Sequence, residues 1–149
     1  MEIEMKLAMV FLFLIFPLFA FGQEKVADQE KTTIYVYANS SSTSMGRINK
    51  SVYLGEKEIA QIRPERFFII SINPGTYALH LKDKKVGGLE KEFEAGKTYY
   101  VKIQFASDGF FIKPRSISLV PQENGLFEIK QLKPIDKDNI KIPDLVRSN

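Results

Sequence analysis

Cysteine is absent from this sequence of 149 residues, and histidine occurs once. The lack of cysteine excludes disulfides, thiolate nucleophiles and cysteine-based zinc sites, and it removes the lipidation site of a bacterial lipoprotein. Any transition-metal site would have to be dominated by carboxylates, which select poorly for zinc. We therefore predict no cofactor and no metal centre, and a fold that is held together by its apolar core alone.

Charge of one sign is not concentrated anywhere in the chain, although the formal net charge is +3. A nucleic-acid surface needs lysine and arginine gathered on one face. Here the basic residues stand beside acidic ones, as in the segments 56–58 and 90–92. We therefore predict no nucleic-acid partner. Hydrophobic residues make up 44% of the chain, which is enough for a packed core and excludes wholesale disorder.

The longest apolar run lies close to the start of the sequence, over Leu7–Phe21. It is shorter than the roughly 20 residues that a membrane-spanning helix needs, and Pro17 interrupts its later half. Small residues before Gln23 fit the pattern recognised by signal peptidase, so we predict a signal peptide over 1–22, cleaved between Gly22 and Gln23. The chain would then be periplasmic or secreted. The alternative is an uncleaved leader, which would be the only contact with a membrane.

Most of the remaining chain alternates apolar and polar residues with a period of two, which is typical of strands. In Thr33–Ala38, for example, two tyrosines alternate with β-branched and small residues. The segment Phe67–Ile72 is almost wholly apolar, so we expect a central strand covered on both faces. The predicted strands are 33–38, 50–54, 58–62, 67–72, 76–82, 89–94, 98–105, 110–113 and 116–120.

Turn residues separate these strands at the spacing of a sandwich. Gly55 predicts a tight hairpin turn, and Asn73–Gly75 predicts a type II turn, because proline fixes φ and glycine accepts a positive φ. No amphipathic run is long enough for a crossover helix, while Pro121–Leu132 fits either a short helix over 123–130 or an irregular segment. We predict an all-β fold, a single antiparallel β-sandwich of about seven to nine short strands. Whether a short helix forms near the C-terminus is left undecided.

The organisation that follows has one folded domain with short flanking segments. Residues 23–32 are polar and without periodicity, which predicts a flexible lead-in. The sandwich domain is expected over 33–132. Residues 133–149 are charged and interrupted by proline, so we expect a loose tail. Three apolar residues could dock this tail on the domain: Ile140, Ile142 and Leu145.

Three segments together resemble the DUF2846 family of uncharacterised exported bacterial domains. They are SVYLGEKEIAQI (51–62), NPGTYALHL (73–81) and EAGKTYYVKI (94–103). The resemblance lies in a hairpin with a short turn, a Pro-Gly turn into a strand, and a Gly-Lys-Thr-Tyr-Tyr turn and strand, and it extends over Thr33–Leu132. Similar turns occur in PEGA-like and carboxypeptidase-regulatory-like modules. The resemblance implies a compact β-sandwich outside the cytoplasm and no known activity or catalytic residues.

Residues that could carry chemistry are few and scattered. His80 lies in a predicted strand between two leucines, which fits a solvent-facing or hydrogen-bonded histidine better than a base or metal ligand. Glu90, Glu92 and Glu94 share one face of a strand, where carboxylates could serve acid–base chemistry or bind calcium, but a solvated face is the simpler interpretation. We predict no catalytic residues and no enzymatic activity.

Aromatic residues on the strands provide the one candidate binding surface. Alternation turns some tyrosines outward, where they could contact a sugar, a peptide or a partner, or else pack a two-sided core. The main hypothesis is a non-catalytic interaction or envelope-associated module whose partner is an unknown envelope protein. The alternative is a small-ligand or carbohydrate-binding protein that uses outward tyrosines. The candidate surface consists of Tyr35, Tyr37, Tyr77, Tyr100, Phe110 and Phe111.

Overall fold

The computed structural model describes residues 30–40, 48–82, 86–107 and 112–148. The predicted signal peptide and its cleavage site, Gly22 and Gln23, lie outside these residues, as do Phe110 and Phe111. The described elements are β1 (Thr32–Ser40), β2 (Lys50–Leu54), β3 (Lys57–Ile62), β4 (Arg66–Ile72), β5 (Gly75–Leu81), β6 (Gly88–Phe93), β7 (Thr98–Ser107), β8 (Ile112–Val120), α2 (Gln122–Ile129), β9 (Lys133–Pro134), the 3-10 helix η2 (Lys137–Asn139) and β10 (Val146–Arg147).

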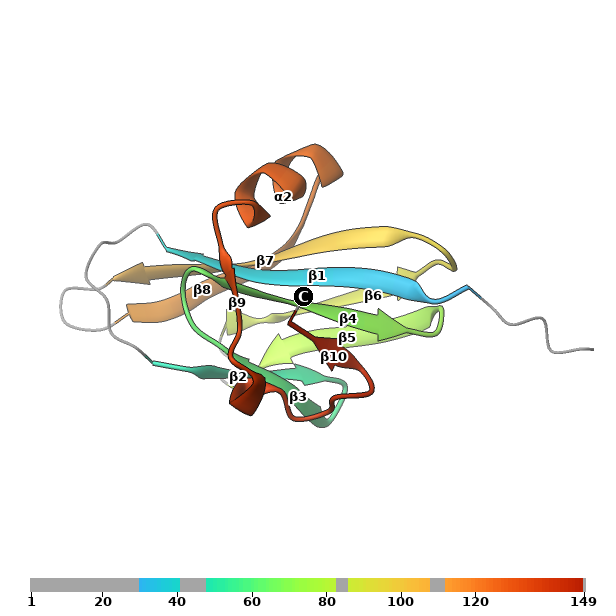
Figure 1. Ribbon diagram of the computed structural model, residues 1–149, viewed down its shortest axis with the longest axis horizontal. Coiled ribbons are helices and arrows are strands. Elements are labelled where there is room, and N and C mark those ends of the chain that lie inside the picture. The colour runs from blue at the N-terminus through green and yellow to red at the C-terminus, as the bar shows by residue number, and fades with distance from the viewer. Residues whose placement is uncertain (1–29, 41–47, 83–85, 108–111, 149) are drawn as a thin grey trace, which may run out of the picture.

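The strands form two sheets, which confirms the predicted all-β sandwich (Figure 1). A six-stranded sheet has the order β10-β4-β1-β7-β8, with β9 paired to β4. A four-stranded sheet has the order β3-β2-β5-β6. Two pairings depart from a purely antiparallel sandwich: β1 runs parallel to its neighbour β7, and the two-residue strand β9 runs parallel to β4.

The alternating apolar residues meet between the two sheets, as the period of two requires. Along β1, Ile34, Val36 and Ala38 are fully buried, and the apolar side chains of the other strands join them. Each fully buried valine, leucine, isoleucine or phenylalanine side chain contributes about 1.5–3 kcal/mol, so this layer is the main source of stability. The core contains Ile34, Val36, Ala38, Val52, Ile59, Ala60, Ile62, Phe68, Ile70, Ile72, Leu79, Leu81, Phe93, Val101, Ile103, Phe105, Ile135 and Val146.

Two local predictions need correction. The type II turn expected at Asn73–Gly75 is wrong, because the φ of Gly75 is 150°, whereas a type II turn needs about 80°. The link carries the chain from β4 in one sheet to β5 in the other, so it does not reverse direction within a sheet. The two last strands predicted from sequence are one strand, β8, which contains Pro114 opposite Phe105 beside a register shift. Proline is tolerated there because β8 is an edge strand.

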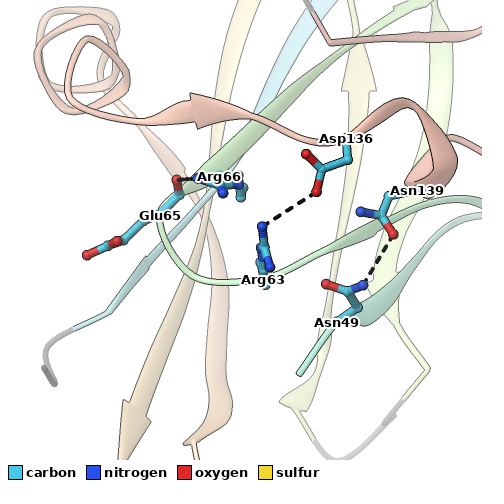
Figure 2. A network of polar contacts seen from close by, with 6 residues as sticks. All are labelled: Asn49, Arg63, Glu65, Arg66, Asp136 and Asn139. Atoms are coloured by element: carbon cyan, nitrogen blue, oxygen red, sulfur yellow. Dashed lines mark hydrogen bonds and ion pairs between the residues drawn. The ribbon is translucent and has the colours of Figure 1, made fainter. Parts of the chain in front are cut away.

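The segment after Leu132, expected to be a loose tail, instead packs along the sandwich. Both β9 and β10 pair with β4, and Ile135 and Val146 are 4% and 2% exposed. The three residues expected to dock do pack against the core. Polar contacts also join this segment to the domain, as Figure 2 shows: Arg63 lies 3.5 Å from Asp136, and Asn49 donates to Asn139 at 3.2 Å.

Candidate functional site

The outer face of the six-stranded sheet carries most of the predicted tyrosine surface, but α2 lies over that face (Figure 1). Tyr35 and Tyr100 stack with their rings 5.0 Å apart and 8° from parallel. Tyr37 and Tyr100 are 0% and 3% exposed, and Tyr35 is half-buried. The expectation that Tyr37 and Tyr100 form an exposed surface is therefore wrong. The strand alternation was correct, but the helix that follows β8 covers the outward side chains.

Gly125 explains how closely the helix approaches the sheet. It is buried in the middle of α2, and a Cβ atom added there would overlap Cβ and Cγ of Tyr100. Glycine normally weakens a helix interior by about 1 kcal/mol relative to alanine. Its presence here is accounted for by packing, because only a residue without a side chain lets the helix backbone rest on the tyrosine.

A cluster of charged and polar side chains holds the C-terminal end of α2 against the sheet. Glu128 pairs with Lys102 at 2.8 Å, and Asn39 donates to the same carboxylate at 3.4 Å. Burial raises the pKa of Glu128, but hydrogen bonding and charge from Lys102 more than offset this, so the pKa lies below its ordinary value. Burial and then the charge of Glu128 raise the pKa of Tyr37, whose buried hydroxyl makes no well-formed hydrogen bond within the described residues.

This cluster predicts that α2 loosens in acid. A carboxyl group whose pKa is lowered by folding stabilises the protein above its unfolded-state pKa, and that stabilisation disappears as the pH falls through the folded-state pKa. Amide exchange over 122–129 should therefore speed up as the pH falls below about 4.5, after correction for intrinsic exchange. In Glu128→Gln this acid-dependent change should largely vanish, and an unchanged pH profile in that variant would contradict the assignment.

Tyr77 lies elsewhere, in an open groove at one end of the sandwich with a volume of about 670 Å³. We call it the end groove. It is formed by Lys31 just before β1, the β2–β3 turn, the link from β4 to β5 and the C-terminal segment before β10. Its lining residues are Lys31, Leu54, Gly55, Glu56, Lys57, Ser71, Ile72, Asn73, Thr76, Tyr77, Ala78, Ile142, Asp144 and Leu145.

The end groove combines apolar walls with a mixed polar rim. Leu54, Tyr77 and Leu145 are half-buried and pack against the core, so their remaining surface forms the wall. The charged lining residues are exposed and carry both signs. Lys31 and Lys57 are positive, and Glu56 and Asp144 are negative. Sequence reasoning named Tyr77 but missed the rest of this site, because its parts are far apart along the chain. The apolar residues of the tail were the available signal.

His80 supports one wall of the end groove. Its Nε2 atom lies 2.7 Å from the carbonyl oxygen of Gly55, and its Nδ1 atom lies 3.0 Å from that of Leu81. The imidazole also stacks on Tyr53 with a centroid distance of 5.3 Å. The histidine is therefore a hydrogen-bonded strand residue that ties β5 to the β2–β3 turn.

The three glutamates singled out from the sequence do not converge on either site. Glu90 and Glu92 are exposed along β6, and Glu94 pairs with Lys97 at 2.6 Å. Within the described ranges, no three histidine, aspartate or glutamate side chains are grouped so that they could hold a metal ion. In the same part of the chain, no helix has the length and apolar character needed to cross a membrane.

Comparisons with known proteins place the chain in a family but leave its role open. A family model described as a protein of unknown function (DUF2846) matches residues 28–114. No curated protein matches the chain. A solved structure with similarity is the N-terminal domain of AlgF from P. aeruginosa, with 16% identity and a TM-score of 0.37, covering 64% of this chain and 99% of that one. The similarity is too low to carry a functional argument.

Proposed function

Because this chain belongs to the DUF2846 family, whose function is unknown, we propose that it is an exported, non-catalytic module that binds a protein partner through the end groove. The observation that carries this proposal is the groove itself. Its volume of about 670 Å³ is within the usual range of binding sites. Four separate chain segments build it, and half-buried apolar side chains line it.

The chemistry of the groove favours a peptide segment that presents an apolar side chain. Leu54, Tyr77 and Leu145 leave apolar surface available on the walls, and burying it would drive association. The rim carries positive and negative side chains in balance, which suits the alternating donors and acceptors of a peptide better than a strongly charged ligand. An envelope protein with a short extended segment is the occupant that we propose.

The distribution of titratable groups supports a non-catalytic role. Catalytic groups usually combine a cleft with shifted pKa values. Here Tyr37 and Glu128, which have shifted pKa values, lie where α2 meets the six-stranded sheet and not in the end groove. The exposed glutamates of β6 are likewise apart from the groove. Export is supported by the apolar run Leu7–Phe21 with its small residues before Gln23.

A small ligand or carbohydrate remains the second candidate, and Tyr77 is the observation that favours it. Its ring lies in the groove, 6.4 Å from the ring of Phe93, and an aromatic ring of this kind can stack on a sugar. Screening the protein on a glycan array distinguishes the two candidates. Saturable binding to one glycan class that is lost in Tyr77→Ala would favour the carbohydrate.

The peptide proposal predicts that filling the groove abolishes binding. Peptides selected from a displayed random library should bind the wild-type protein, and Asn73→Trp should weaken them by about tenfold or more, since the indole would occupy the groove. Asn124→Trp, at an exposed position of α2, is the matched control and should bind normally. Equal binding by the two variants, or no selected peptides, would count against the end groove as the contact surface.

A further inference from the structure

Most described sheet edges are blocked or carry charges that discourage strand pairing. The edge of β3 is capped by the tail, through the bridge between Ala60 and Ile140. The edge of β4 is covered by β9 and β10. Along β6, the exposed edge carries Glu90 and Glu92. Charged residues and covering segments of this kind are the usual protection against unwanted pairing.

The second half of β8 is different. This strand ends the six-stranded sheet and, among the described strands, pairs with β7 alone. Its first half contains Lys113, Pro114 and Arg115, which protect an edge. The remaining residues, Ser116–Val120, have the sequence SISLV and contain neither charge nor proline. Leu119 in this stretch is 37% exposed, which is unusual for a large apolar residue on the core side of a strand.

We propose that Ser116–Val120 is the contact surface for a second copy of this chain, which adds its own β8 in antiparallel orientation to give a two-fold symmetric dimer. In such a pair, two opposed residues must face the same side of the sheet, so the axis must pass through a residue. An axis at Ser118 pairs all five uncharged residues with one another. An axis one residue earlier would instead bring Arg115 opposite Leu119.

The pairing about Ser118 is complementary in its side chains. Ile117 of one copy would lie opposite Leu119 of the other, on the core side, so the apolar layer would continue from one sandwich to the next. Serine would face serine at the axis on the outer side. The occupant is therefore a second copy, since the stretch complements itself.

The dimer is expected to be weak, because five residue pairs bury a small area. Sedimentation equilibrium of the purified protein should show a concentration-dependent dimer, and amide exchange over 116–120 should slow as the concentration rises. Ser118→Lys places two ammonium groups opposite each other at the axis and should raise the dissociation constant by about tenfold or more. Ser116→Lys is the control, because Ser116 is also exposed but faces Val120 of the other copy.

A charge-pairing experiment separates this contact from general effects on solubility or folding. Ser118→Lys and Ser118→Glu should each be monomeric alone, and a mixture of the two should form a heterodimer, because opposite charges then meet at the axis. The proposal is overturned if the wild-type protein stays monomeric at millimolar concentration, if Ser118→Lys dimerises as the wild type does, or if the mixture shows no heterodimer.

Discussion

A chain that ends at Leu132 is expected to lose a large share of its stability, although the sequence predicts only a loose tail beyond that residue. Ile135 and Val146 are almost completely buried, and each contributes about 1.5–3 kcal/mol. Removing them also exposes the edge of β4, which β9 and β10 cover. From these two residues alone we expect a loss of about 3–6 kcal/mol in the free energy of unfolding, which is a large share of the 5–15 kcal/mol typical of a domain.

Urea unfolding followed by far-ultraviolet circular dichroism would measure this loss. Arg63→Ala is an informative control, because it removes the surface contact with Asp136 but leaves the buried tail residues in place. Its effect should be below about 1 kcal/mol, as for other exposed ion pairs. If the truncated chain were as stable as the full chain, the tail would not be part of the folded domain and the end groove would lose one of its walls.

Substitution of Gly125 is expected to destabilise the protein although it improves the helix. Gly125→Ala should gain about 1 kcal/mol in helix propensity. The new Cβ atom would overlap Tyr100 near the root of its side chain, where the ring cannot simply rotate away. Overpacking of this kind costs about 1–3 kcal/mol, so the net change should be a loss, and Gly125→Val should lose about 3 kcal/mol.

The sign of the effect is the critical result, and a neighbouring residue provides the comparison. Asn124 is exposed on the same helix, so Asn124→Ala should leave stability unchanged or raise it by a few tenths of a kcal/mol. Near-ultraviolet circular dichroism, which reports on the stacked Tyr35 and Tyr100, should change only in the Gly125 variants. A stabilising Gly125→Ala would mean that α2 does not rest on Tyr100.

The strands were predictable because each follows from local alternation. The segment Phe67–Ile72, for example, has no polar residue except Ser71, and it forms β4 with only one residue added. The parallel pairing of β1 with β7 was not predictable. It joins segments about 65 residues apart, and the sequence shows no crossover helix that would indicate a parallel pair. The prediction of a type II turn at Gly75 failed for a related reason. A Pro-Gly pair indicates a change of chain direction but not which sheet the next strand joins.

The candidate site was less predictable than the fold. Alternation correctly placed Tyr35 and Tyr37 outward from the core, but exposure depends on whether another element covers that face. A short helix was one of two possibilities for this segment, and its position over the tyrosines depends on the contact between Gly125 and Tyr100, which no local pattern reveals. The end groove combines residues as far apart in the sequence as Lys31 and Leu145, so it forms only when the chain is folded.

Chemical-shift mapping of a selected peptide on the isotope-labelled protein tests most directly whether the end groove is the contact surface. We predict that the perturbed amides fall in 54–57, 71–73, 76–78 and 142–145, which surround the groove. We also predict that the amides of α2 stay unchanged. Perturbations centred on α2, with the groove amides unaffected, would contradict the account.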